Sequence, residues 1–170
     1  MSKGSAVKKE SASKKDSVRK SIARNRKALH EYHIEETFEA GLVLTGTEVK
    51  SLREGRANLT DGFGLIFQGE AWLEHAYIPE YTQGTWTNHS ARRRRKMLLH
   101  KSEILRITQK VREAGHTLIP LELYFDGSRV KVEIAIARGK KDWDKRQALR
   151  EKQDKREAER AMKDKVRRGE

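Results

Sequence analysis

The stretch "IPLELYFDGSRVKVEIAI", residues 119–136, carries the strongest fold signal in the chain. Every second residue from Ile119 to Phe125 is apolar, and the same alternation resumes from Val130 to Ile136. A period of two is typical of strands that bury one face. The Asp-Gly pair between the two runs favours a tight two-residue turn, because such turns need residues that tolerate positive φ. The stretch therefore predicts a β-hairpin with one face in a core.

Weaker strand signals occur nearer the N-terminus. Residues 63–67 and 71–78 alternate around the turn "QGE" and predict a second hairpin. Residues 32–44 also alternate and pass through Gly41, where we expect a bend or bulge. In "GTEVKSLREG", residues 46–55, Val49 and Leu52 lie three apart between two glycines, which predicts a short helix.

One longer helix is predicted over "SEILRITQKVREAG", residues 102–115, where Ile104, Ile107 and Val111 fall at helical spacing. Ser102 is placed to cap this helix and Gly115 to end it. Several short antiparallel strands with inserted helices are typical of a small closed barrel. The predicted fold is therefore mainly β, an antiparallel barrel of the oligonucleotide-binding (OB) type, with its body at residues 23–138.

Charge divides the chain into three segments. Residues 1–27 contain ten Lys or Arg and two Asp or Glu, residues 28–138 contain fifteen of each, and residues 139–170 contain thirteen and eight. The net charges are thus +8, 0 and +5. Two basic ends on a neutral body indicate a polyanionic partner, most commonly nucleic acid, with an acidic membrane surface or acidic protein as weaker alternatives.

Two terminal extensions are expected. Residues 1–22 are rich in Ser and Lys without apolar periodicity, which predicts a disordered basic arm. Residues 139–170 contain helix formers but few apolar residues, which predicts a basic tail that is disordered when free and helical on a partner. The chain has no cysteine and no apolar segment of membrane-spanning length, so a cytoplasmic protein without membrane association is expected.

No catalytic or metal-binding motif stands out. The sequence lacks a phosphate-binding glycine-rich loop, a nucleophile elbow and a helix with paired metal-ligating histidines. His30 and His33 lie in a strand-like stretch, where neighbouring side chains point to opposite faces. We therefore expect no enzyme, no metal, no cofactor and no small-molecule substrate.

Basic runs and isolated aromatic residues are better candidates for binding. The run "RRRRK", Arg92–Lys96, favours contact with phosphates, because guanidinium groups match phosphate oxygens two at a time. A second basic group is "RKSIARNRK", residues 19–27. Trp86 lies in a polar loop, where base stacking and core packing remain equal alternatives. Trp143 lies between two aspartates, which favours stacking on an external partner.

Several of these motifs together resemble the SmpB family, the SsrA-binding proteins that partner transfer-messenger RNA (tmRNA) in bacterial ribosome rescue. The resemblance rests on "NRKALHEY" (25–32), "FEAGLVLTGTEVKSLREG" (38–55), "RRRRKMLLHK" (92–101), "LYF" (123–125) and "ARGKKDWDKR" (137–146). It implies an OB-type barrel that binds the tRNA-like domain of tmRNA and helps deliver alanyl-tmRNA to stalled ribosomes, with elongation factor Tu as an indirect partner. It implies no covalent chemistry by the protein itself.

The resemblance also implies two sets of RNA-contacting residues. The expected tmRNA surface of the body, which includes the basic runs, is Asn25, Arg26, Lys27, His30, Glu39, Lys50, Arg92, Arg93, Arg94, Arg95, Lys96, Leu98 and His100. The tail is expected to enter the empty messenger channel of the small subunit and to approach the decoding site in its ribosomal RNA. The tail residues expected there are Gly139, Lys140, Lys141, Trp143, Asp144, Lys145 and Arg146.

Two other function classes stay open from the residues alone. A general ribosome-associated OB-type protein without tmRNA specificity would have the same charge pattern and fold. An RNA-acting enzyme would need a general acid and base that are distant in sequence.

Overall fold

The computed structural model describes residues 18–83, 86, 88–113 and 115–169, with the backbone only at Asp142 and Trp143. Seven strands and four helices lie in this part of the chain. Their order is β1 (Arg19–Arg24), α1 (Arg26–Glu31), β2 (Tyr32–Leu42), α2 (Gly46–Arg53), β3 (Phe63–Phe67), β4 (Glu70–Glu74), β5 (Arg95–Leu98), α3 (Lys101–Val111), β6 (His116–Asp126), β7 (Arg129–Gly139) and α4 (Asp142–Arg168). Within the described ranges, no helix combines the length and apolarity needed to cross a membrane.

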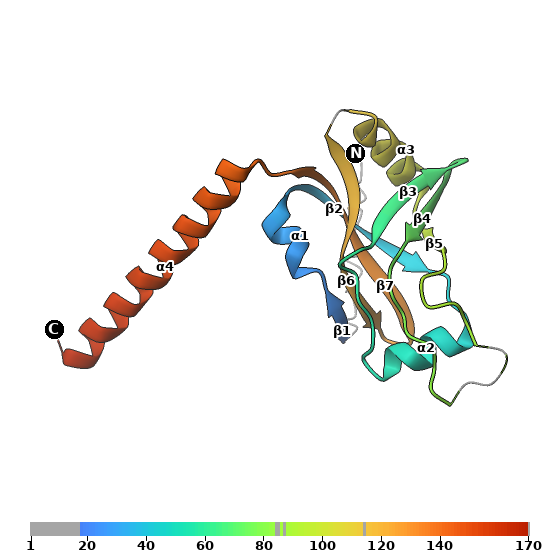
Figure 1. The fold of residues 1–170 in the computed structure, drawn as a ribbon, viewed down its shortest axis with the longest axis horizontal. Helices are drawn as coiled ribbons and strands as arrows, with labels where there is room; N and C mark the ends of the chain where they lie inside the picture. Colours follow the sequence, from blue (N-terminus) through green and yellow to red (C-terminus); the bar gives the residue numbers. More distant parts are fainter. Residues whose placement is uncertain (1–17, 84–85, 87, 114, 170) are drawn as a thin grey trace, which may run out of the picture.

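The strands form one antiparallel sheet that closes into a barrel. Hydrogen bonds connect them in the order β6, β3, β4, β5, β2 and β7, and the pairing of β7 with β6 completes the ring. Strand β1 is added at the free part of the β6 edge (Figure 1). This architecture confirms the predicted small antiparallel barrel of the OB type.

The hairpin of β6 and β7 is confirmed, but two of its details differ from the prediction. The turn residues are Gly127 and Ser128, flanked by the paired Asp126 and Arg129, and of the two only Gly127 has positive φ (63°). The register also shifts between Pro120 and Glu122. Proline lacks a backbone donor and is tolerated at such an irregularity.

This shift in β6 changes which face each residue joins. Leu123 and Phe125 lie in the barrel interior, whereas Ile119 and Leu121 pack in a second, outer cluster with Ala28 of α1. The prediction that all four alternating residues of β6 share one face is therefore wrong, because the bulge adds one residue and reverses the parity.

Strand β2 contains a comparable bulge. Its register with β7 shifts between Ile34 and Glu36, so Ile34 joins the outer cluster and Phe38 the interior. The bulge predicted at Gly41 is thus misplaced. Gly41 lies instead opposite Leu98 of β5, where a Cβ atom would lie 3.3 Å from the leucine side chain.

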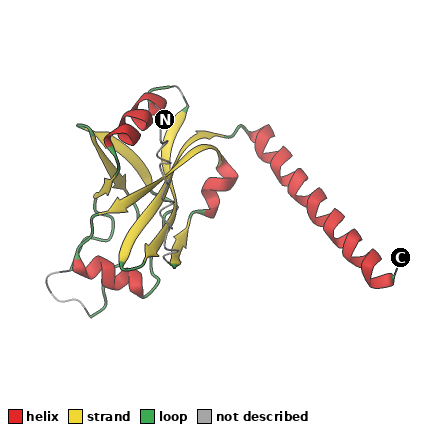
Figure 2. Cartoon of the chain, turned by 180° about the vertical axis from the view of Figure 1, so that it is seen from behind, coloured by secondary structure: helices red, strands yellow, loops and turns green. Residues whose placement is uncertain are grey.

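Helices α2 and α3 cover opposite ends of the barrel (Figures 1 and 2). Leu52 of α2 and Ile107 of α3 are buried in the interior cluster. The longer helix starts one residue before the predicted cap: His100 is the N-cap of α3, and Ser102 lies inside its first turn. Gly115 follows the helix with φ of 81°, a conformation that glycine adopts without strain.

The N-terminal arm is shorter than predicted. Residues 19–22, which were expected to be disordered, belong to β1 and pair with β6. Arg19 holds this edge strand by ion pairs to Glu122 (2.5 Å) and Glu133 (2.8 Å), while its guanidinium lies 3.8 Å from the centre of the Tyr124 ring. Residues 1–17 of the predicted arm lie outside the described part of the chain.

The C-terminal tail forms one helix of 27 residues that projects away from the barrel (Figures 1 and 2). This is the helical form expected for the bound tail. From Leu149 to Gly169 each residue is exposed, so little beyond the helix's own hydrogen bonds holds this segment. That the free tail is disordered stays a prediction.

Candidate nucleic-acid interface

Helix α1 borders a groove on the outer face of the barrel. The groove has a volume of about 490 Å³ and is lined by Arg24, Asn25, Arg26, Leu29, Leu121, Glu122 and Glu133. Arg26, Lys27 and His30 are exposed on α1, and their predicted contact with RNA stays a prediction. The groove brings cations and an exposed leucine together, a combination that suits phosphates beside sugars or bases.

Asn25 has a different role from the one predicted. Its side chain accepts a hydrogen bond from the Ala28 N–H (3.2 Å) and donates one to the Pro120 carbonyl (3.0 Å), so it caps α1 and ties the helix to β6. The residue is 5% exposed. Because the amide is buried and hydrogen-bonded within the protein, the structure gives this side chain a role in positioning α1, and its direct contact with RNA stays a prediction.

Glu39 lies on the same outer face, one strand from the groove. It is paired in register with Glu133 of β7, which lines the groove. The carboxylate accepts hydrogen bonds of 2.5 Å each from the Tyr124 hydroxyl and the Lys131 ammonium group. These two bonds, that of Lys131 foremost, lower the pKa of Glu39, while burial and the bond to Glu39 raise the pKa of Tyr124.

Leu98 and His100 extend this surface along β2 and β5. Leu98 is 54% exposed and lies opposite Gly41, two residues beyond Glu39 on the same side of β2. The His100 side chain is 88% exposed at the start of α3. The structure thus places Glu39 and Leu98 on neighbouring strands, with His100 two residues further, as a contact surface would require.

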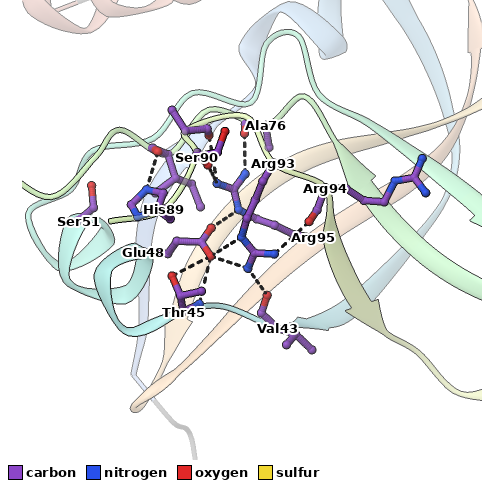
Figure 3. Close-up of polar contacts among 12 residues, drawn as sticks. Val43, Thr45, Glu48, Ser51, Ala76, His89, Ser90, Arg93, Arg94 and Arg95 are labelled. Atoms are coloured by element: carbon purple, nitrogen blue, oxygen red, sulfur yellow. Dashed lines mark hydrogen bonds and ion pairs between the residues drawn. The ribbon is translucent and has the colours of Figure 1, made fainter. Parts of the chain in front are cut away.

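The run Arg92–Lys96 is arranged differently from the prediction. Figure 3 shows Arg93 and Arg95 converging on the carboxylate of Glu48, which lies on α2. Arg95 is fully buried and also donates to the carbonyls of Ala76 (2.7 Å) and Ala91 (3.0 Å). The side chain of Arg95 therefore belongs to the barrel interior in this structure, and its predicted RNA contact, which would require it to leave these partners, stays a prediction.

Glu48 organises this cluster. Its carboxylate also accepts from the Thr45 N–H (3.1 Å), which caps α2, and from the Arg93 Nη2 (2.5 Å). Burial alone would raise the pKa of Glu48, but the hydrogen bonds from Arg95, Thr45 and Arg93 outweigh this and hold the pKa below its usual value. The carboxylate therefore stays ionised opposite the buried guanidinium.

The remaining bases of the run also have acidic neighbours. Arg92 pairs with Asp61 (3.5 Å), Arg94 with Glu74, and Lys96 with Glu70 (3.0 Å). Since these side chains remain partly exposed, their predicted RNA contact stays a prediction. To contact a phosphate, each base would have to leave its carboxylate partner or contact both groups at once.

Lys50 lies on α2, which covers the end of the barrel and is separate from α1 (Figure 1). Its ammonium group is 5.7 Å from the centre of the Tyr81 ring. The structure does not bring Lys50 together with the α1 groove. Trp86, in the loop that follows Tyr81, is 93% exposed, so core packing is excluded for it.

The start of the tail is fastened to α1 and β2. The Lys140 N–H donates to the Glu31 carbonyl (2.8 Å), and its ammonium group donates to the Leu29 carbonyl (3.3 Å). Asp144 accepts from the Lys141 N–H (3.3 Å) at the start of α4 and lies 3.5 Å from His33 Nε2. Gly139 ends β7, while Lys145 and Arg146 follow on the first turns of α4.

Trp143 lies within α4, but its side chain is outside the described part of the structure. Its predicted stacking on an external base stays a prediction.

Sequence reasoning missed three residues of these networks: Glu48, Tyr124 and Lys131. Glu48 carried a detectable signal, since it precedes Leu52 by four residues and so lies on the buried stripe of α2. Tyr124 and Lys131 carried none, because their meeting at Glu39 depends on the pairing of three strands.

The chain is similar in sequence to a known protein family. The sequence model of the SmpB protein family matches residues 22–164. An SsrA-binding protein of Renibacterium salmoninarum is 66% identical over 151 residues, which cover 89% of this chain and 97% of that protein. An SsrA-binding protein of Streptomyces avermitilis is 64% identical over 148 residues, which cover 87% and 84% respectively.

A solved structure, "tmRNA-SmpB: a journey to the center of the bacterial ribosome", contains a chain of similar fold and sequence. The TM-score is 0.61 and the identity 48%, over 71% of this chain and 85% of that chain. Because the family match and these relatives extend over most of its length, the protein belongs to the SmpB family.

Proposed function

We propose that this protein binds tmRNA, the SsrA RNA, and acts in trans-translation on stalled bacterial ribosomes. The observation that carries the proposal is its membership of the SmpB family, together with relatives named SsrA-binding protein and a similar chain in a tmRNA-SmpB ribosome structure. SmpB proteins bind RNA, and we assign this chain a binding role without covalent chemistry of its own.

The tmRNA-facing surface in this proposal joins the α1 groove to Glu39, Leu98 and His100. Arg26 and Lys27 would contact phosphates, since exposed cations provide most of the affinity for a nucleic-acid backbone. Glu39 would accept hydrogen bonds from base amino groups, because a carboxylate repels phosphate but accepts from N–H donors. Leu98 offers an exposed apolar contact for a sugar or base.

In this proposal the protein binds the tRNA-like domain of tmRNA. It then helps deliver alanyl-tmRNA, together with elongation factor Tu, to stalled ribosomes in the cytoplasm. Helix α4 would then lie in the empty messenger channel of the small subunit, with Lys140, Lys141 and Arg146 near the decoding site. The exposure of the helix and its basic charge support this placement.

A competition experiment tests the tmRNA proposal. The full chain is bound to labelled tmRNA at a fixed salt concentration and challenged with unlabelled tmRNA or bulk tRNA in a gel-shift assay. We expect bulk tRNA to compete at least about tenfold less well, a difference of about 1.4 kcal/mol. Equal competition by the two RNAs would identify a general RNA-binding protein and exclude tmRNA specificity.

A further inference from the structure

Helix α1 has little apolar packing to hold it on the barrel. It consists of six residues, and its buried residue is the small Ala28. Leu29, the largest apolar side chain of the helix, is 61% exposed. Isolated helices of this length are unstable in water, because nucleation is unfavourable and few hydrogen bonds follow it. The position of α1 therefore depends on polar contacts at its two ends.

The N-terminal end of α1 is held by Asn25. Its side chain accepts from the Ala28 N–H and donates to the Pro120 carbonyl, and its backbone N–H donates to the Leu121 carbonyl (2.8 Å). These contacts fix the start of the helix on β6. The carbonyl groups of the last turn, which lack partners inside any helix, need contacts of their own.

The C-terminal end of α1 is held by Lys140, the residue that follows β7. Its ammonium group donates to the Leu29 carbonyl (3.3 Å), and its backbone N–H donates to the Glu31 carbonyl (2.8 Å). Both donors of this half-buried residue thus point at α1, beside the place where the chain leaves the barrel for α4 (Figures 1 and 2). One residue from outside the helix satisfies two carbonyl groups of its last turn.

The positive charge of Lys140 suits this position. The C-terminus of a helix carries partial negative charge and is stabilised by a cation. The last turn of α1, residues 28–31, reads "ALHE": it contains His30 but no Lys or Arg, and it ends in an acid, Glu31. Lys140 therefore supplies from another element the cation that the sequence of α1 lacks at this end.

The contacts at both ends determine how α1 presents its exposed side chains. Arg26, Lys27 and His30 are exposed on this helix, and Arg26 also lines the groove beside it. If the last turn were loose, these side chains would have to be ordered when a partner binds, and that ordering would lower the affinity. A preformed helix avoids this loss.

We infer that Lys140 is a positioning residue for tmRNA binding: it holds the C-terminal end of α1, so that the cations of this helix face the RNA in a fixed orientation. This inference rests on the proposed function, which assigns α1 to the tmRNA surface. It gives Lys140 a task in the body, in addition to the place near the decoding site expected for it. With Lys140 fixed to α1, the tail can change direction only from Lys141 onward.

Three single variants of the full chain test this role. Lys140→Met removes the ammonium group but keeps the backbone N–H and a side chain of similar length. The matched control is Lys152→Met, an equal change of charge at an exposed position of α4. Lys140→Arg is the conservative variant, because a guanidinium group also donates to a carbonyl.

Amide hydrogen exchange of the free protein shows whether Lys140 holds α1. In Lys140→Met we expect the N–H groups of residues 30–32 to exchange about three- to tenfold faster, since a hydrogen bond contributes stability equivalent to roughly this factor. Lys152→Met and Lys140→Arg should exchange like the unmodified chain. Unchanged exchange in Lys140→Met would overturn the inference.

Binding to tmRNA is then titrated at several salt concentrations. Lys140→Met should bind about three- to tenfold more weakly, with the slope of log K against log salt unchanged, because the cations of α1 still reach phosphates in the complex. Lys140→Arg should restore the affinity, and Lys152→Met should keep it. A slope lower by about 0.7–0.9 units in Lys140→Met would mean direct phosphate contact, and equal losses in Lys140→Met and Lys152→Met would mean a general charge effect; either result refutes a positioning role.

The inference and the proposed function fail in different ways. If the unmodified chain does not prefer tmRNA over bulk tRNA, the proposed function is contradicted, while the exchange of α1, measured without RNA, still decides whether Lys140 holds the helix. If the unmodified chain prefers tmRNA and Lys140→Met binds it equally well, the inference alone is wrong. Thermal unfolding of Lys140→Met should stay within about 2 °C of the unmodified chain; a larger fall would make Lys140 a residue of the whole fold and contradict its specific role at α1.

Discussion

At the scale of single residues, the burial of a charge depends on its partner. Arg95 occupies the barrel interior because Glu48 supplies the compensating charge and two carbonyls accept its other donors. A buried ion pair adds little stability compared with apolar packing, but removal of one partner leaves an uncompensated charge. Glu48 therefore controls the stability of α2, β5 and the segment before β5 together.

The substitution Glu48→Gln should lower the free energy of unfolding by about 3–5 kcal/mol at pH 7, because it leaves Arg95 buried without a counter-charge. Urea denaturation at pH 7 measures the effect. Glu70→Gln is the matched control: it removes the partly exposed partner of Lys96 and should change stability by less than about 1 kcal/mol. Similar losses for the two variants would contradict the interior role of Glu48.

The same residue makes a prediction for acid. Since the folded-state pKa of Glu48 is below its value in the unfolded chain, its contribution is present above the unfolded pKa of about 4.3 and is lost as pH falls through the folded pKa. The free energy of unfolding of the unmodified chain should therefore fall more steeply as the pH is lowered than that of Glu48→Gln. Parallel pH profiles would show that folding does not lower the pKa of Glu48.

Glu39 should act in binding rather than in folding. Its carboxylate is on the outer face and the lowered pKa keeps it ionised at neutral pH. We expect Glu39→Gln to weaken tmRNA binding about tenfold, by about 1.4 kcal/mol, with thermal unfolding nearly unchanged. A filter-binding titration measures this, with Glu54→Gln, at the residue that follows α2, as control. A loss of stability that matches the loss of binding would make Glu39 a structural residue.

At the scale of elements, bulges decide which cluster a strand residue enters. The register shifts in β2 and β6 let the same strands line the barrel interior with one half and support α1 with the other.

The close approach of two strands also constrains the sequence. At Gly64 of β3 a Cβ atom would lie 2.4 Å from the Leu118 side chain of β6, closer than carbon atoms can pack.

Gly64→Ala should therefore destabilise the barrel by about 1–3 kcal/mol, because the added methyl group forces β3 and β6 apart or Leu118 off its rotamer. Gly46→Ala, at an open helical position, should be neutral or slightly stabilising. The double variant with Leu118→Ala should cost less than the sum of the single variants in a double-mutant cycle. Strict additivity would refute the steric explanation.

At the scale of the whole molecule, two parts with separate tasks share one short connection. The barrel is closed and its described charges are largely paired, whereas α4 is joined to it through Gly139, Lys140 and the contacts of Lys140 and Asp144 with α1 and β2. Because Lys140 contacts the carbonyls of α1, the tail begins directly beside the proposed tmRNA surface.

Truncation after Lys141 should consequently leave the free energy of unfolding within about 0.5 kcal/mol, since α4 packs little apolar surface on the barrel. Binding to tmRNA should persist, and binding to messenger-free small subunits should weaken strongly. Denaturation and binding assays on the same preparation measure the free energy of unfolding, the binding to tmRNA and the binding to small subunits. A truncated chain that unfolds or loses tmRNA would show that the tail belongs to the body.

Local patterns were enough to predict the two hairpins, α2 and α3, the closed antiparallel barrel and the helical tail. Period and turn chemistry act between near neighbours, so the sequence contains them directly. The family resemblance named the surface around α1, Glu39 and Leu98.

The fate of individual charges depended on tertiary structure. In the sequence, "RRRRK" resembles a phosphate site, but in the fold Arg95 meets Glu48, a residue 47 positions away, and becomes part of the interior. The bulges at Glu35 and Leu121 likewise arise from strand pairing. Each bulge reverses the side of the sheet that alternation alone would assign to the residues beyond it. Sequence by itself determined the two hairpins, α2, α3 and the helical tail, because their signals are local. Only the tertiary structure decided that β1 and β5 pair into the sheet and that α1 forms. It also decided which cations are neutralised and which remain available to RNA, because an ion pair is a contact between segments.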